Sequence, residues 1–532
     1  MKRFYILLVV IVATFSLVAC KSDGATTADA EKGENTLVMS WPKDIGGEVN
    51  PHAYSPNEMF AQAMLYDPLV VYENDGTISP GLAESWVLSE DGKTYTFKLR
   101  EGVKYSDGSL LTAENVKRNF DTVVANIDAH SWLEVVAVIQ TVEVVDKQTV
   151  AIHLKDSYYP FLQELALIRP LRMLADAGFP DSGSTAEGVK MAIGTGPWVL
   201  TAYEKDSYAE FTRNESYWGK KPSLEKVVVK VMGDSQGRMM ALEKGDIDLI
   251  FGSGQLAPAE FKTLEDKGEY VTKISEPLST RLIAINSTSG ITQNKEVRQA
   301  FQYLLDRQTV VEHVLNGLEI PATTLFSPSF PYSELNVTTF EYNQEKAADI
   351  LDAVGWVMDP EKNVRVKDGQ ALSVVLAFNS SDQIQKSIAE YIQGEWKKSG
   401  VEVQLAGEES QILSGRLKAG EFDLAFNDTW GAPYDLHMYI RTMLGEKQIG
   451  NYALSGTESK AQLEEEIMKV IRTTDEAQRR ALYESILSAI QQEAIFIPIS
   501  YRQNYLVAND VFTSLNFSPQ QYEVPFNLYE MK

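Results

Sequence analysis

The chain has 532 residues with 44% hydrophobic and 10% aromatic content, which excludes a disordered protein and predicts two or three domains with sizeable cores. Its formal net charge of −25 excludes a nucleic-acid-binding protein, because that function requires a basic surface. A single cysteine excludes a disulfide within the chain, so stability must come from packing.

The first twenty residues have the layout of a secretory signal. Two cationic residues precede an apolar run over residues 4–18, which is shorter than the roughly 20 residues that a membrane-spanning helix needs. Cys20 follows a small-residue cleavage site that resembles a bacterial lipobox; a cleaved signal with an incidental cysteine is the alternative. We therefore expect a signal peptide over 1–19, and a lipid anchor with a flexible tether over 20–35 that holds the protein on the extracytoplasmic side of the cell membrane.

Strands dominate the N-terminal half, with helices between them. Alternating apolar residues predict the strands, and turn or N-cap residues mark where helices begin. The expected strands are 36–41, 94–99, 141–145, 149–154 and 227–232, with a short buried strand within 245–250. The expected helices are 58–66 with Asn57 as its N-cap, 112–120 and 236–243.

From about residue 280 onward, apolar strands alternate with helices of 3.6-residue periodicity. This alternation predicts βαβ units and a mostly parallel sheet. The expected strands are 372–378, 402–405, 423–427 and 495–499, and the expected helices are 298–305, 346–354, 383–398, 464–471 and 476–493.

The sequence lacks the common catalytic motifs. It contains no nucleophile elbow, no phosphate-binding P-loop and no H-E-x-x-H helix, and its one cysteine lies at the anchor. No two of its histidines stand at i, i+4 spacing, so a local cage of imidazoles for a transition metal is excluded; they are His52, His130, His153, His313 and His437. We therefore expect no enzyme and no cofactor. A hydrolase with a carboxylate pair and a sensor or adhesin scaffold are the alternatives from other classes.

The stretch 82–120, LAESWVLSEDGKTYTFKLREGVKYSDGSLLTAENVKRNF, resembles the signature region of family 5 extracellular solute-binding proteins. These are the peptide- and nickel-binding receptors of ABC importers. The resemblance continues through GTGPWVL from residue 194, RNESYWGKKP from residue 213 and ALEKGDIDLIFG from residue 241.

This resemblance implies an α/β, two-lobed periplasmic-binding-protein fold of type II. Lobe I would combine 36–278 with 503–532 and carry a small inserted subdomain, and lobe II would be 279–502. Two crossing segments would form a hinge, with ligand bound in the cleft between the lobes. The protein would act as a monomer that delivers its ligand to ABC permease subunits and touches the membrane only through its lipid.

Within that family, the chain is most similar to the branch of nickel-binding receptors. The matching stretches are NPHAYSPNEMFAQ from residue 50, SYYPFLQELALIRPLR from 157, TWGAPYDLH from 429 and IPISY from 497. Receptors of this branch hold the metal together with a small chelator and contact mainly the chelator. The resemblance implies as ligand-binding residues Tyr54, Met59, Trp132, Arg169, Trp430, Tyr434, Gln448 and Tyr522.

The chemistry of these residue types supports that assignment. Arg169 can hold a carboxylate with two parallel hydrogen bonds, and Trp132 and Trp430 can form rigid apolar walls. The tyrosines add hydroxyl groups, and Met59 could offer a thioether contact. The structural alternatives are an ion pair for Arg169, helix packing for Trp132 and a core position for Met59.

Two departures from the branch affect the expected ligand. Ala129 stands where the branch has an arginine, and Gln448 stands where it has a metal-ligating histidine. We therefore predict no direct bond between protein and metal, and His437 is not expected to replace the missing ligand. The leading hypothesis is a receptor for nickel bound to histidine or to an opine-type metallophore; a di- or oligopeptide receptor is the alternative.

Overall fold

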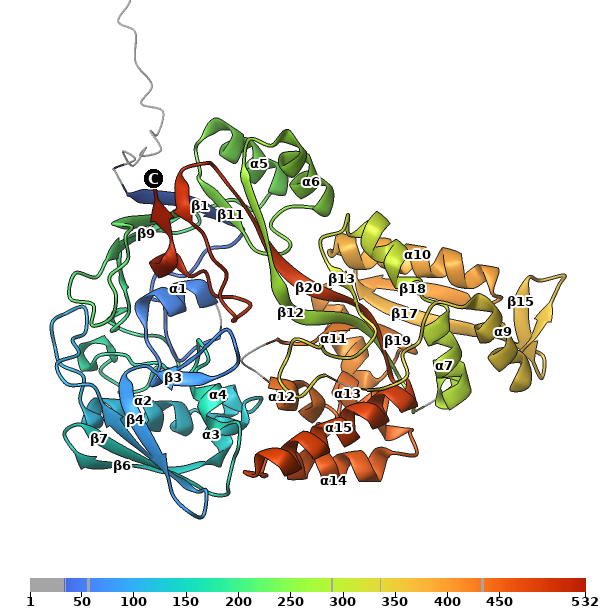
Figure 1. Ribbon diagram of the computed structural model, residues 1–532, viewed down its shortest axis with the longest axis horizontal. Coiled ribbons are helices and arrows are strands. Elements are labelled where there is room, and N and C mark those ends of the chain that lie inside the picture. Colours follow the sequence, from blue (N-terminus) through green and yellow to red (C-terminus); the bar gives the residue numbers. More distant parts are fainter. Residues whose placement is uncertain (1–32, 34, 55–57, 289, 335, 432–434) are drawn as a thin grey trace, which may run out of the picture.

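The computed structural model describes residues 33, 35–54, 58–288, 290–334, 336–431 and 435–532. The expected signal peptide, Cys20, nearly all of the tether, Asn57 and Tyr434 lie outside the described residues. Within the described ranges, no helix is both long and apolar enough to span a membrane. Figure 1 shows an elongated molecule whose two halves are joined by a pair of long strands, β12 (Val271–Ile285) and β20 (Phe496–Ala508).

In the described part of the chain, an 11-stranded mixed sheet runs through both halves. β12 and β20 are antiparallel neighbours at its centre, and irregularities in their register interrupt the pairing. On the side of β12 lie β19 (Leu424–Asp428), β17 (Ser373–Asn379) and β18 (Glu402–Glu408). On the side of β20 lie β11 (Leu249–Phe251), β1 (Thr36–Trp41), β10 (Lys226–Val231), β9 (Tyr208–Arg213) and β8 (Trp198–Glu204), while β13 (Ile320–Pro321) also pairs with β20.

The expectation of a mostly parallel sheet in the C-terminal half is correct for only three strands. β17 is parallel to both β18 and β19, and α10 (Gln383–Lys398) and α11 (Ser410–Ala419) connect them as βαβ units. Asp382 caps α10, which buries Ile388 and Ile392 on one face. β12 is antiparallel to both β19 and β20. The sheet is mixed because β12 and β20 run between the two halves of the molecule. A parallel neighbour would need a crossover connection such as a helix, whereas β12 and β20 pair antiparallel with each other.

A second, antiparallel sheet with the order β4-β5-β7-β6 lies in the N-terminal half, coloured blue to teal in Figure 1. Its strands are β4 (Ala83–Leu88), β5 (Thr94–Leu99), β6 (Ile139–Asp146) and β7 (Thr149–Leu154). α2 (Ala113–Ala125) begins after Thr112, whose side chain accepts a hydrogen bond from the Asn115 N–H. Its buried Val116 and Phe120 belong to the same apolar cluster as residues of this sheet. This sheet lies within the residues expected for lobe I, which the resemblance implies to carry a small inserted subdomain.

The other elements complete the two halves. The remaining α-helices of four or more residues in the described ranges are α1 (Met59–Leu65), α3 (Glu134–Val138), α4 (Phe161–Leu165), α5 (Ser235–Lys244), α6 (Pro258–Lys267), α7 (Lys295–Tyr303), α9 (Gln344–Ala353), α12 (Asp435–Arg441), α13 (Ile449–Ser455), α14 (Lys460–Val470) and α15 (Glu476–Glu493). Short strands pair as β2 (Val70–Tyr72) with β3 (Ile78–Pro80), β14 (Val357–Asp359) with β15 (Val364–Lys367) and β16 (Gln370–Ala371), and β21 (Phe512–Ser514) with β22 (Glu530–Met531).

Apolar side chains from both halves pack into one buried cluster. Phe161 of α4 belongs to this cluster together with Leu436 of α12 and Tyr483 of α15. The two halves are therefore in direct contact below the strand pair β12–β20 in the view of Figure 1. The residue boundaries expected for the two lobes stay a prediction.

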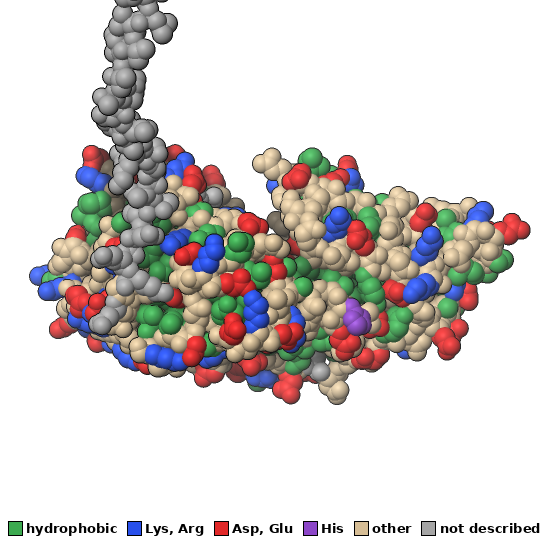
Figure 2. Space-filling view, turned by 90° about the horizontal axis from the view of Figure 1, so that it is seen from above, with side chains coloured by type: hydrophobic (Ala, Val, Ile, Leu, Met, Phe, Trp, Pro, Cys, Tyr) green, Lys and Arg blue, Asp and Glu red, His purple; other side chains and the backbone are tan. Residues whose placement is uncertain are grey.

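The surface carries charges of both signs. On the face shown in Figure 2, acidic and basic side chains alternate with apolar and uncharged ones, and no broad basic patch gathers among the described residues there. This distribution is in keeping with the exclusion of nucleic acid as a partner.

Candidate functional site

Arg169 and Tyr54 are in contact at the junction between the segments that follow α4 and precede α1. The Arg169 Nη1 donates a hydrogen bond to the Tyr54 carbonyl oxygen. The Arg169 Cζ also lies 4.9 Å from the centroid of the Tyr54 ring, within the range of a cation–π contact. Two contacts of different kinds thus hold the guanidinium against one residue, which orients its planar fork.

His130 contacts the hydroxyl group and the ring of Tyr54. The Tyr54 hydroxyl oxygen lies 2.6 Å from the His130 Nδ1, and the two rings meet edge to face with centroids 5.2 Å apart. His130 is only 1% exposed. Burial lowers the pKa of His130 to about 4, so the imidazole is neutral at physiological pH and adds no positive charge beside Arg169.

Trp132 and Trp430 form an aromatic contact between segments far apart in the sequence. Trp132 lies edge to face on Tyr54 with ring centroids 5.2 Å apart. Trp132 also packs against Trp430, whose ring is perpendicular to it at a centroid distance of 6.4 Å. Each indole is 37% exposed, so neither is an ordinary core residue. The structure therefore brings Tyr54, Trp132, Arg169 and Trp430 into one group of touching side chains, which we call the aromatic–arginine cluster.

The backbone fixes Trp430 on the edge of β12. Thr429 and Thr280 exchange two hydrogen bonds, one from the Thr429 N–H to the Thr280 carbonyl at 2.9 Å and one from the Thr280 N–H to the Thr429 Oγ1 at 2.7 Å. Gly431 has a φ of +73°, and a Cβ there would lie 2.0 Å from the Leu278 carbonyl oxygen. Only glycine fits this close approach, so the loop that presents Trp430 is held against β12.

Tyr522 lies within electrostatic reach of the cluster. Desolvation raises the pKa of Tyr522, the Asp428 carboxylate raises it further, and the Arg502 and Arg169 guanidinium groups lower it. Asp428 and Arg502 form an ion pair with an Oδ2–Nη1 distance of 2.8 Å. Tyr522 therefore feels the charges of this ion pair and of Arg169.

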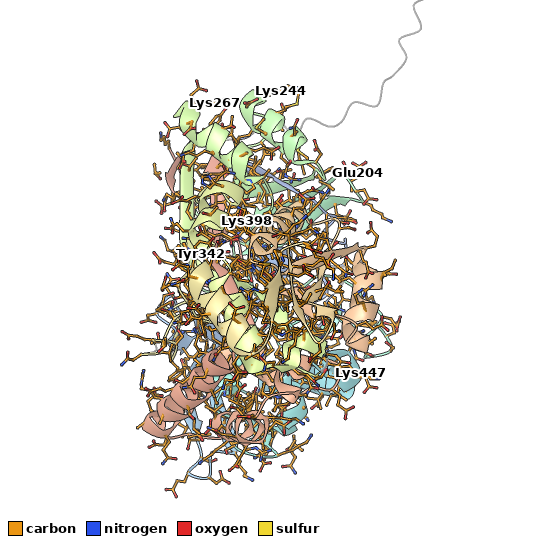
Figure 3. The ribbon with its side chains drawn as sticks, turned by 90° about the vertical axis from the view of Figure 1, so that its right-hand side faces the viewer. Glu204, Lys244, Lys267, Tyr342, Lys398 and Lys447 are labelled. Carbon is orange, nitrogen blue, oxygen red and sulfur yellow. The ribbon has the colours of Figure 1, made fainter. Side chains whose placement is uncertain are left out.

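The remaining expected site residues are less informative. Met59 begins α1 and is partly buried. Gln448 is exposed and precedes α13; its neighbour Lys447, labelled in Figure 3, lies at the edge of the molecule in that view. Tyr434 lies outside the described residues. The roles of these three residues stay predictions.

A cavity of about 630 Å³ lies away from the expected site residues, between the start of α6 and the start of α10. Its arginines already pair with carboxylates of the protein: Arg281 with Glu319 at 2.8 Å, and Arg502 with Asp428 at 2.8 Å. A ligand carboxylate would have to compete with these internal partners, so the cavity is a weaker candidate for an anionic ligand.

Sequence reasoning missed the contacts of two histidines. His130 was visible only as a residue close to Trp132, and its contact with Tyr54 spans 76 residues of sequence. His437 is fully buried, and its Nε2 lies 2.8 Å from the Glu164 Oε1. Among the described residues, no three His, Cys, Asp or Glu side chains gather so as to hold a metal ion.

The comparison with protein families shows to which family the chain belongs. The family described as "Bacterial extracellular solute-binding proteins, family 5 Middle" matches residues 77–451. The chain belongs to family 5 of the bacterial extracellular solute-binding proteins. This family 5 protein is 39% identical over 513 residues to the nickel-binding periplasmic protein of Escherichia coli K12, covering 96% of its own length and 97% of the relative.

Solved structures and further relatives agree with this assignment. The crystal structure of NikA from Brucella suis in complex with Fe(III)-EDTA matches 93% of the family 5 protein and 100% of that chain, with a TM-score of 0.91 and 43% identity. The oligopeptide-binding protein AppA of Bacillus subtilis is 25% identical, with 78% of each chain covered.

The expected α/β, two-lobed fold is confirmed. The protein is a solute-binding component of an ABC importer, and because its relatives are transport receptors, the expectation of a non-enzyme is confirmed as well.

Proposed function

We propose that the protein captures a metal chelate, nickel bound to histidine or to an opine-type metallophore, and delivers it to an ABC permease. The observation that carries this proposal is the aromatic–arginine cluster, in which Arg169 is fixed on Tyr54 beside the indoles of Trp132 and Trp430. The similarity to nickel-binding and chelate-bound relatives supports the metal part of the ligand.

Each part of the cluster suits a carboxylate-bearing chelate. Arg169 supplies a bidentate donor fork for a carboxylate, and the indoles exclude water around the complex, which strengthens that interaction. Because the ligand brings its own metal donors, the protein needs no metal-ligating side chains. No bond between the protein and the metal is part of the proposal.

The test is calorimetric titration of the protein with the nickel–histidine complex, with Arg169→Ala and Arg169→Lys measured alongside. Loss of the guanidinium leaves the ligand carboxylate unpaired, so Arg169→Ala should lose about 2–5 kcal/mol of binding free energy. Arg169→Lys should recover only part of it, because an ammonium cannot form the bidentate pair. The matched control is Arg480→Ala on α15, whose side chain is 64% exposed. Undiminished affinity in Arg169→Ala would remove the proposal.

A di- or oligopeptide is the second candidate ligand. It is favoured by Ala129 and Gln448, which depart from the nickel-binding branch, and by the peptide-binding relatives. A peptide receptor needs a carboxylate for the ligand amine. The candidate is Asp428, whose Oδ2 pairs with Arg502 and whose Oδ1 has no hydrogen-bond partner among the described residues. Titration with metal-free dipeptides separates the two candidates, because only a peptide receptor binds them without nickel.

We also propose that Cys20 is acylated, so that the protein is held on the extracytoplasmic side of the membrane as a monomer. The tether 20–35 would leave the lobes 36–278 with 503–532, and 279–502, free to meet the permease. Cys20→Ala expressed in the native host should move the protein from the membrane fraction to the soluble fraction. A variant that stays with the membrane would contradict lipid anchoring.

We further propose that β12 and β20 act as the hinge between these lobes, since both strands run through the two halves. Small-angle scattering should then show a smaller radius of gyration once the nickel–histidine complex is added. An unchanged radius at saturating ligand would count against a hinge closure.

A further inference from the structure

His130 is the buried end of a short series of contacts that ends at Arg169. Its Nδ1 contacts the Tyr54 hydroxyl at 2.6 Å, and its ring packs edge to face on the Tyr54 ring. Tyr54 in turn contacts Arg169 twice, through its carbonyl oxygen and through its ring face at 4.9 Å. A displacement of Tyr54 would therefore alter these two contacts of the guanidinium.

We propose that His130 is a positioning residue for ligand binding, which fixes Tyr54 and through it Arg169 in the orientation that receives a ligand carboxylate. The inference rests on the function proposed above. His130 itself need not touch the ligand. Its part is to keep the donor fork in one geometry before the ligand arrives, which lowers the ordering cost of binding.

The structure also indicates which nitrogen of His130 carries the hydrogen. The Nε2 is buried and has no hydrogen-bond partner among the described residues. A buried N–H without a partner is rarer and costlier than an acceptor without one. The hydrogen is therefore on Nδ1, so that His130 donates and the Tyr54 hydroxyl oxygen accepts. Because burial lowers the pKa of His130 to about 4, protonation does not disturb this arrangement at neutral pH.

The first test needs no ligand. Nitrogen-15 chemical shifts of the histidine rings distinguish Nδ1–H from Nε2–H, and His130 is assigned by comparison with His130→Asn. The expected result is Nδ1–H for His130, and Nε2–H would overturn the assigned donor. In the same spectra, hydrogen exchange at the Arg169 Nε–H should accelerate at least severalfold in His130→Phe. Unchanged exchange would show that His130 does not fix Arg169.

The second test measures affinity for the nickel–histidine complex in matched variants. His130→Phe keeps an aromatic ring without the hydrogen bond and should bind about tenfold more weakly. His130→Asn places an amide N–H close to the former Nδ1–H and should recover most of the affinity. The control is His153→Phe on β7, whose partly exposed ring contacts Glu143 and Thr94. His130→Phe should also add little to Tyr54→Phe, because both remove the same contact.

The outcomes separate this inference from the proposed function. Equal affinity of His130→Phe and wild type, or an equally weak His130→Asn, would overturn the positioning role. If the wild type itself fails to bind the complex, the proposed function fails, while the ring shifts and the Arg169 exchange still decide what His130 does. If His130→Phe does not fold, the other two variants provide the test. His130→Asn should bind the nickel–histidine complex nearly as tightly as wild type, and Tyr54→Phe should bind it more weakly.

Discussion

The Glu164 Oε1 and the His437 Nε2 lie 2.8 Å apart, and both side chains are fully buried where α4 meets α12. The Tyr158 hydroxyl donates to the same carboxylate oxygen at 2.6 Å, and the Val135 N–H donates to the other at 2.8 Å. A buried carboxylate is tolerated only when such donors surround it. One of the three donors comes from the opposite half of the molecule, so this contact stabilises the packing of the two halves.

Replacing His437 with alanine should destabilise the protein. Glu164 would lose one of its donors in a site that water does not reach, so the free energy of unfolding should fall by about 2–4 kcal/mol. Urea unfolding followed by circular dichroism measures this change. The control is His313→Ala, an exposed histidine that should leave the midpoint unchanged. Equal midpoints for His437→Ala and wild type would show that the contact contributes nothing.

Gly431→Ala should weaken ligand binding. The new Cβ would clash with the Leu278 carbonyl oxygen at 2.0 Å and would also occupy a φ of +73° that alanine disfavours. The loop must then shift, and Trp430 with it, so affinity for the nickel–histidine complex should fall severalfold. Gly245→Ala at the end of α5 is the matched control, because its φ is +78° but nothing lies within 4 Å of the new Cβ. If both variants bind as wild type, the placement of Trp430 does not depend on this contact.

Stability should fall as the pH falls from about 6.5 to about 4, because of His52. Burial lowers the pKa of His52 to about 4, although the Arg172 carbonyl and Asn119 oppose the shift. In that pH window the unfolded chain takes up a proton and the folded chain does not, so protonation favours unfolding by up to about 3 kcal/mol. His130, whose pKa is also lowered to about 4, adds an effect of the same sign.

Urea unfolding at several pH values measures this dependence. In His52→Gln, the free energy of unfolding should fall less between pH 6.5 and pH 4 than in wild type, even if the variant is less stable at pH 7. His153→Gln, at a partly exposed position on β7, serves as the control. If the free energy of unfolding falls equally with pH in His52→Gln and wild type, His52 is not the source of the pH dependence.

Trp132 and Trp430 should contribute to binding as a pair. Each single alanine variant should lose affinity for the nickel–histidine complex. The double variant should lose less binding free energy than the two single variants added together, because the indoles are in contact, with ring centroids 6.4 Å apart. The coupling free energy expected for an aromatic pair is about 0.5–1.5 kcal/mol. A complete double-mutant cycle by calorimetry provides this value. Strict additivity would show that the two indoles act separately.

Local patterns in the sequence predicted much of the fold. The strands expected at 94–99 and 149–154 coincide with β5 and β7, and the helix expected at 383–398 coincides with α10. These elements carry their own signals, such as the alternation in β5 and the Asp382 cap of α10. β20 was expected only over 495–499 but continues to Ala508, because its partner is β12, more than 200 residues away in the sequence.

The site was predictable only through the resemblance to a family. No spacing within the sequence indicates that Tyr54, Trp132, Arg169 and Trp430 touch, since each lies on a different segment. The resemblance named all four, and the structure brings them together. It did not name His130 as a partner of Tyr54, because a buried histidine has the same appearance in a sequence whether it positions a neighbour or only fills space.

Native mass spectrometry of the protein incubated with nickel, histidine and a mixture of dipeptides tests the central claim most directly, because it weighs the bound ligand. The account predicts a mass increase that equals nickel plus its histidine chelator and that is lost in Arg169→Ala. A mass increase that equals a dipeptide without metal, or nickel without a chelator, would contradict it.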